Sequence, residues 1–210
     1  MAKGSKSLEV PKGAIVTPLA ADLALSEGIS LIDSKDQRPT AASTSGMEST
    51  ADTKTDPQPS NNVVAFGSDH GGFKLKESLR QYAETLGYKV VDVGTHSEDP
   101  CDYPDFAYAV AALVSKGEAW RGVMIDGAGI GSCVVANKVP GVKAACCHNE
   151  FVARNAREHN DTNVLTLGSK VVGSEVCKEI LRIWLETWFA GGRHKLRVDK
   201  IVDVEARFLK

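Results

Sequence analysis

The first 62 residues of this 210-residue chain contain no aromatic residue, because all 3 Trp, 4 Tyr and 6 Phe come later. Aromatic side chains supply much of the apolar area that a core buries, so this segment cannot build a large core by itself. The remaining length is enough for one well-buried domain. The composition therefore predicts a main domain over residues 63–210, preceded by an extension.

The chain also lacks the features of several other protein classes. Its five cysteines form no Cys-x-x-Cys pair and leave an odd one, which argues against a disulfide framework and a zinc cluster. No apolar run approaches the roughly 18 residues of a membrane span, and the N-terminus lacks the apolar region of a signal peptide. A formal net charge of -2 provides no basic field. We expect a soluble cytoplasmic protein without nucleic-acid or membrane partners.

Residues 1–32 nevertheless contain one patterned stretch. Thr17 is a candidate N-cap with a proline directly after it, apolar residues then recur at helical spacing, and Gly28 is a candidate stop. The pattern predicts a short amphipathic helix, followed by an extended piece over residues 29–32. Residues 33–62 are rich in Ser, Thr, Asp, Lys, Pro and Gln, which is typical of a disordered linker.

From residue 63 onward, short apolar runs alternate with stretches of helical periodicity. The predicted strands are residues 63–67, 88–93, 123–125, 142–147 and 164–167. The predicted helices are residues 73–86, 106–116, 130–138, 150–158, 174–189 and 193–210. Because helices of this length separate successive strands, the pattern predicts an α/β domain with a parallel, doubly wound, five-stranded sheet.

The central stretch of the domain is a glycine-rich turn, Gly127–Gly131, between an apolar run that ends in Asp126 and a predicted helix. Three glycines within five residues let the backbone approach a ligand closely, and the amides that open the helix can bind an anion. Tight packing of a strand against a helix explains this stretch equally well when it is taken alone. No lysine stands where a P-loop requires one, which argues against nucleotide hydrolysis.

Polar residues follow several of the predicted strands. Asp69 and His70 follow the first strand, Asp126 follows the third, and His148 and Asn149 follow the fourth. Because ligands of such sheets bind beyond the carboxyl ends of the strands, these residues are predicted to gather at one site.

Two arginines near the C-terminus form a second candidate site. Arg193 and Arg197 are four residues apart, so a helix would place both guanidinium groups on one face, where they could hold a phosphate. A solvated basic turn is the competing interpretation.

Five motifs, in this order, resemble the ribose-5-phosphate isomerase B and galactose-6-phosphate isomerase family: GSDHGGFKLKESL, DYPD, DGAGIGSCVVANKVPGVKAA, REHNDTNVLTLGSKVVG and GGRHKLRV. The resemblance spans residues 63–206. It implies a Rossmann-like sheet and a homodimer or dimer of dimers with active sites between subunits. It also implies that the substrate is a phosphorylated sugar, such as ribose 5-phosphate, a related pentose phosphate or a hexose phosphate. Its aldose and ketose forms would interconvert through an enediolate without a metal or organic cofactor.

The resemblance also implies roles for individual residues. Asp69 would contact a sugar hydroxyl, and His159 would be the acid/base that opens the sugar ring. The residues implied to hold the enediolate are Gly127, Ala128, Gly129, Gly131 and Asn160. Those implied to contact the phosphate are His70, Arg193, Arg197 and, from the neighbouring subunit, Arg157. Tyr103 would face the substrate. For His70 and His159 the alternative is a capping or hydrogen-bonded surface histidine.

The catalytic base cannot be carried over unchanged. Many family members have a cysteine where this chain has Asp126 and a threonine where it has Ala128, and others have a glutamate at the position of Ser132. Asp126 is the predicted base, since a carboxylate packed against apolar strand ends is suited to proton abstraction. The alternative is a reassigned site, either for a different sugar phosphate or in a non-catalytic sugar-phosphate-binding protein.

The extension resembles segments found on enzymes of bacterial microcompartments, on the stretch VPKGAIVTPLAADLALSEGISLID. This resemblance implies that residues 8–32 dock on a shell or cargo partner while the linker leaves the enzyme free, which would place the protein within a microcompartment. A cargo or scaffold protein without catalysis and an inert extension are the alternatives.

Overall fold

The structure is a computed structural model that describes residues 6–10, 24, 28–33 and 62–208. The chain divides into two compact units, residues 1–54 and 55–210. In the first unit, β1 (Lys6–Val10) pairs in parallel with β2 (Ile29–Asp33). The piece predicted to be extended lies in β2, whereas β1 was not predicted. The predicted amphipathic helix lies outside the described residues, apart from Ala24, which is helical and buried.

The second unit contains a five-stranded parallel sheet with the strand order β4-β3-β5-β7-β6. Its strands are β3 (Val63–Ser68), β4 (Lys89–Asp92), β5 (Arg121–Asp126), β6 (Ala144–Cys146) and β7 (Val164–Gly168). The three central strands are buried almost throughout, as expected for a parallel sheet covered on both faces. The prediction of a parallel, doubly wound sheet is therefore confirmed.

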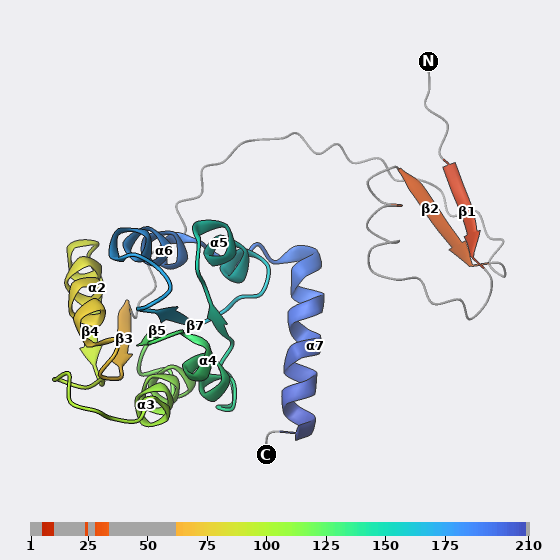
Figure 1. Ribbon diagram of the computed structural model, residues 1–210. Helices are drawn as coiled ribbons and strands as arrows, with labels where there is room; N and C mark the ends of the chain where they lie inside the picture. Colours follow the sequence, from red (N-terminus) through yellow and green to blue (C-terminus); the bar gives the residue numbers. More distant parts are fainter. Residues whose placement is uncertain (1–5, 11–23, 25–27, 34–61, 209–210) are drawn as a thin grey trace. The chain divides into compact units, whose positions relative to one another are not determined.

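Helices cover both faces of this sheet (Figure 1). One face carries α2 (Phe73–Thr85), α5 (Glu150–Glu158) and α6 (Ser174–Glu186), and the other carries α3 (Tyr103–Ser115) and α4 (Ile130–Ala136). Side chains alternate along β5, so that Val123 and Ile125 join the core under the first group of helices and Met124 joins the core under the second. Each layer therefore has its own apolar core.

Helix α3 begins at Tyr103, three residues before its predicted start at residue 106. Asp102 stands at the N-cap position in an extended conformation, and Pro104 lies in the first turn. Proline is favoured there because its fixed φ suits a helix start and its missing N–H is not needed. The early start places Tyr103 at the beginning of the helix, next to the carboxyl edge of the sheet.

The last helix, α7 (Gly192–Phe208), lies beside α4 and α5 (Figure 1). The Gly141 amide donates to the Glu205 carboxylate at 2.9 Å. Between α7 and the body of the domain lies a groove of about 600 Å³. Its apolar lining includes Val142, Ala144, Val152, Ile201, Val204 and Phe208. Only Val198 of α7 is buried, so the helix presents an uncovered apolar stripe.

The amino edge of the sheet is joined to α6 by one buried arginine, Arg121, which is 1% exposed. Its guanidinium donates to the carbonyls of Trp184 at 2.5 Å, Leu185 at 2.7 Å and Thr187 at 3.1 Å. The last carbonyls of a helix lack donors within the helix. Arg121 therefore caps the C-terminal end of α6 from the first position of β5.

Within the part of the chain that the structure describes, none of the helices combines the length and the apolar character that crossing a membrane requires.

Candidate active site

The candidate site lies at the carboxyl edge of the sheet, where the strand order reverses. The chain leaves β3 for its neighbour β4 and then returns past β3 to β5. Asp69 directly follows β3, is 8% exposed, and donates its backbone N–H to the Ile125 carbonyl at 3.2 Å. Asp69 therefore follows β3 and Asp126 ends the adjacent strand β5, at the edge where parallel α/β sheets bind ligands.

Asp126 holds the glycine-rich loop together. Its carboxylate, in a residue 3% exposed, accepts hydrogen bonds from the amides of Ala128 at 2.8 Å and Ser132 at 3.0 Å. It also accepts shorter hydrogen bonds from the Gly129 amide and the Ser132 hydroxyl. A carboxylate offers about four lone-pair sites, so these four donors occupy it. Asp126 thereby orders the loop and the start of α4.

This arrangement bears on two predicted roles. The amides of Ala128 and Gly129 already donate to Asp126. This geometry does not support the prediction that these two amides hold an enediolate. The role of Asp126 as the base remains a prediction. For the carboxylate to accept a proton from the substrate, one of its four hydrogen bonds must break. Ser132, fully buried, is the neighbour that sequence reasoning did not include in the site.

Two glycines of the loop are required by close contacts. Gly129 has a φ of 79°, and a Cβ there would lie 2.9 Å from the Cys146 Sγ. A Cβ at Gly131 would lie 2.6 Å from the Tyr103 ring. The structure therefore places Tyr103, which is 38% exposed, directly on the glycine loop.

Asp69 and His70 form the turn that leads into α2. The Asp69 carboxylate accepts a hydrogen bond from the Gly72 amide at 2.9 Å. His70 is exposed, and its Nδ1 lies 3.2 Å from the Cys101 amide nitrogen. In the tautomer in which the Cys101 N–H donates to Nδ1, the ring proton is on Nε2. His70 can then offer Nε2–H to an anion.

A lysine that sequence reasoning missed lies beside the same loop. The turn after β7 is tied to both neighbouring loops, because Ser169 donates its hydroxyl to the Gly71 carbonyl at 2.8 Å and its amide to the Asp126 carbonyl at 2.8 Å. The exposed Lys170 donates its amide to the Gly127 carbonyl at 3.1 Å. Its side chain passes within 3.8 Å of where a Gly127 Cβ would stand. The sequence signal for Lys170 is its position in the turn after a central strand, where residues of such sheets bind ligands.

His159 and the two C-terminal arginines belong to a second group, at the junction of α5 and α7. The His159 ring stacks on that of His194, with centroids 4.0 Å apart, and its Nδ1 lies 2.8 Å from the Asn155 amide nitrogen. Desolvation, followed by the electrostatic influence of His159, Arg193 and Arg197, lowers the pKa of His194. Arg193 and Arg197 lie in the first turns of α7.

Asn160 lines the groove beside α7, so it belongs with this second group. The role of Asn160 beside the glycine loop remains a prediction.

Arg157 has a different environment from the one predicted. It is 5% exposed and donates to the Asp161 carboxylate at 3.1 Å, to the Thr187 carbonyl at 3.3 Å and, through a shorter contact, to the Thr162 carbonyl. Burial lowers the pKa of Arg157, and Asp161 opposes that shift. A guanidinium that is enclosed in this way joins α5 to the end of α6. The role of Arg157 as a phosphate ligand from the neighbouring subunit remains a prediction, and these contacts within one chain lend it no support.

The fold and the site together define a Rossmann-like α/β domain with a glycine loop, carboxylates and cations at the topological switch point, which is where such domains bind small anionic ligands. The chain belongs to the ribose/galactose isomerase family, whose sequence profile matches residues 64–201.

Among its relatives is ribose-5-phosphate isomerase B of Escherichia coli, 44% identical over 144 residues, which are 69% of this chain and 97% of that protein. D-erythrulose-4-phosphate isomerase of Pectobacterium atrosepticum is 40% identical over 142 residues, 66% of this chain and 91% of that protein. The solved structure of ribose-5-phosphate isomerase B from Clostridium thermocellum matches with a TM-score of 0.69 and 46% identity, over 70% of this chain and 99% of that one.

Proposed function

We propose that this isomerase interconverts ribose 5-phosphate and ribulose 5-phosphate through an enediolate. The observation that carries the proposal is the gathering of Asp69, Tyr103 and the Asp126-bound glycine loop at the switch point, in a chain whose relatives include ribose-5-phosphate isomerases B. A relative named for D-erythrulose 4-phosphate makes a tetrose phosphate the second candidate substrate.

The residues at the carboxyl edge suit the parts of this reaction. Asp126 would remove the proton at C2, Asp69 would contact a sugar hydroxyl, and Tyr103 would face the substrate. The exposed cation Lys170 beside Gly127 suits a phosphate better than the enclosed Arg157 does. No step of this scheme uses a metal or an organic cofactor.

Hydrogen exchange at the substrate tests this proposal. In deuterium oxide, the protein should incorporate solvent deuterium at C2 of ribose 5-phosphate and should form ribulose 5-phosphate. Deuterium incorporation into a tetrose phosphate but not into ribose 5-phosphate would favour the tetrose phosphate as the substrate. Binding of sugar phosphates without incorporation into any of them would leave a non-catalytic binding protein instead.

We further propose that the active protein is a homodimer or a dimer of dimers in which each site combines both groups of residues. One chain supplies the carboxyl edge with Asp69 and Tyr103, and the other supplies His159, Arg193 and Arg197. The uncovered apolar stripe of α7 and the groove beside it provide the area for a second copy to cover.

Mixing two inactive variants tests this arrangement of the site. Asp69→Ala and His159→Ala should each be inactive alone, because each lacks one group. After subunit exchange at equal amounts, half of the dimers are mixed, and each mixed dimer has one intact site, so about a quarter of the parent activity should return. No recovery despite proven subunit exchange would show that both groups act within one chain.

Loss of an arginine on α7 should weaken binding of the phosphate. Arg197→Ala is expected to raise the KM for ribose 5-phosphate by about 10- to 150-fold, because a charge-assisted hydrogen bond contributes about 1.5–3 kcal/mol. Arg207→Ala, at the exposed end of the same helix, is the matched control and should leave KM within about twofold. An equal loss for the unphosphorylated sugar would place Arg197 outside the phosphate site.

For the N-terminal unit we propose docking on a microcompartment shell or cargo partner through residues 8–32. The support is that β1 and β2 form a small unit of their own with exposed apolar residues, Leu8 and Ile32. Deletion of residues 1–60 should leave isomerase activity nearly unchanged while the protein no longer co-purifies with its compartment. A truncated protein that fails to fold would refute this division of roles.

A further inference from the structure

Lys76 is a cation without solvent exposure in the first turn of α2, the first helix of the domain. Its Nζ lies 2.6 Å from an Asp92 carboxylate oxygen and 3.3 Å from a Glu77 carboxylate oxygen, and it donates to the Thr95 carbonyl at 2.9 Å. Burying an ammonium group is costly unless all its hydrogens find acceptors. These three acceptors meet that condition, and two of them lie at the end of β4 and just beyond it.

The same contacts fix the start of the β4–α3 loop, residues 93–102. The Gly94 amide donates to the other Asp92 carboxylate oxygen at 3.0 Å, and the Thr95 amide donates to the Ser68 carbonyl at 3.1 Å. A Cβ at Gly94 would lie only 2.4 Å from the Ser68 amide nitrogen. The loop therefore crosses directly over the end of β3, one residue before Asp69.

The far end of the β4–α3 loop reaches the candidate active site. Ser97 donates its amide to the Thr95 hydroxyl at 3.4 Å, which continues the ordered path away from Lys76. Cys101 then donates its amide to His70, and Tyr103 begins α3 on the glycine loop. The loop thus starts at a buried charge pair, contacts His70 near its far end and leads into Tyr103, which the proposed reaction uses.

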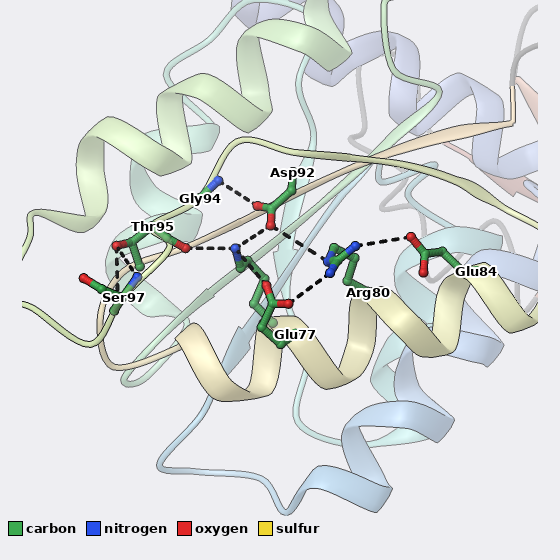
Figure 2. Close-up of polar contacts among 8 residues, drawn as sticks. Glu77, Arg80, Glu84, Asp92, Gly94, Thr95 and Ser97 are labelled. Carbon is green, nitrogen blue, oxygen red and sulfur yellow. Dashed lines mark hydrogen bonds and ion pairs between the residues drawn. The ribbon is translucent and has the colours of Figure 1, made fainter.

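An apolar side chain would fill this position without the cost of desolvating a charge. The buried charge is better explained by its effect on the path of the loop. The Thr95 carbonyl and the Asp92 carboxylate must both point toward Lys76 Nζ, and this fixes the backbone between them. Arg80 lies on the same helix. It contacts Glu77 at 3.0 Å and Glu84 at 3.3 Å, and its Nε stands 3.9 Å from Asp92 (Figure 2). Arg80 makes no hydrogen bond to the β4–α3 loop among the contacts drawn there.

We propose that Lys76 is a positioning residue of the isomerase: by holding Asp92 and the Thr95 carbonyl it fixes the β4–α3 loop, and through that loop the placement of Tyr103 and His70. The inference rests on the proposed function for its catalytic consequence. The anchoring of the loop itself does not depend on the identity of the substrate.

The first test uses the parent protein and needs no substrate. The amides of Gly94 and Thr95 should exchange with deuterium oxide slowly, at rates similar to those of the neighbouring strand β3, because both are hydrogen-bonded in an anchored loop. Exchange of these amides within the dead time of the experiment would show a mobile loop and would overturn the proposal.

The second test compares three variants. Lys76→Met keeps the apolar stem but removes the cation that lies 2.6 Å from Asp92, so it loses stability as well as loop order. The double variant Lys76→Met/Asp92→Asn also removes the carboxylate charge and should regain most of that stability. We expect both to exchange the 93–102 amides at least about tenfold faster and to raise KM about tenfold or more, with a smaller change in kcat. Arg80→Met, on the same helix, should stay within about twofold of the parent in exchange and in KM.

The readouts separate the possible failures. A double variant that is stable and has parental exchange and parental KM would make Lys76 a structural residue only, and an effect of Arg80→Met as large as that of Lys76→Met would do the same. If neither Lys76 variant folds, Asp92→Asn alone still tests the loop, and parental exchange in it would contradict the anchoring. A parent protein that converts no sugar phosphate would refute the proposed function, while the exchange rates would still report on the loop.

Discussion

Replacing Asp126 by asparagine is expected to lower turnover of ribose 5-phosphate by about 10²–10⁴-fold, the loss that follows removal of a positioned general base. The asparagine keeps the shape of the side chain but cannot accept the proton from C2. It also turns an amide NH2, which cannot accept a hydrogen bond, toward donors that previously met a carboxylate oxygen. The measurement is deuterium incorporation at C2 together with single-turnover kinetics.

Two further variants separate a chemical role of Asp126 from its role in holding the loop. Asp126→Cys cannot accept four strong hydrogen bonds, yet a thiolate can abstract a proton, and the family resemblance of the sequence implies a cysteine as the base at this position. If Asp126 is the base, the cysteine variant should exchange C2 faster than the asparagine variant. If Asp126 only orders the loop, the two should be equally impaired.

Ser132→Ala provides the matched control because it removes the hydroxyl donor and keeps the carboxylate. Its thermal unfolding reports what one donor contributes to the loop. An asparagine variant that turns over like the parent would transfer the role of the base to another group at the same edge.

Replacing Arg121 by methionine is expected to lower the free energy of unfolding by about 2–5 kcal/mol. The methionine fills part of the volume but leaves the carbonyls of Trp184 and Leu185 at the end of α6 without their donor. It also removes a guanidinium that stacks 3.9 Å above the Trp120 ring. Denaturant unfolding followed by tryptophan fluorescence measures the change.

Arg182→Met is the matched control for this variant, since Arg182 is on the same helix and its contacts to Glu179 and Glu186 are at the surface. Exposed ion pairs contribute about 0–1 kcal/mol, so this variant should remain close to the parent. Equal losses for both arginines would mean that burial and capping give Arg121 no special role.

Much of the domain could be predicted from the sequence, because buried parallel strands leave continuous apolar runs and helices leave a regular spacing. The strand of residues 164–167 is an example, since it was predicted within one residue of β7. The gathering of Asp69 and Asp126 followed from topology alone. By contrast, β1 was missed because five residues with two apolar side chains carry too little periodicity to be recognised.

The details of the site depend on partners that are distant in sequence, and spacing along the chain does not report them. The resemblance implied a ligand role for Arg157, but spacing along the chain did not reveal that its guanidinium donates to the Thr187 carbonyl, thirty residues away. Lys170 was missed because its relation to Gly127 exists only after β5 and β7 pair. Lys76 gave no signal at all, since a lysine in an amphipathic helix is normally at the surface.

Strand β5 has Arg121 at one end and Asp126 at the other, and it is buried throughout. Five residue steps of a strand separate the two anchors by roughly 16 Å. Distances above about 10 Å usually make substitutions additive. For protein engineering, the two edges of the sheet can therefore be evolved as separate libraries. Heat resistance would be selected around Trp120 and substrate choice around the glycine loop, and the best variants of each library would be combined without a further search.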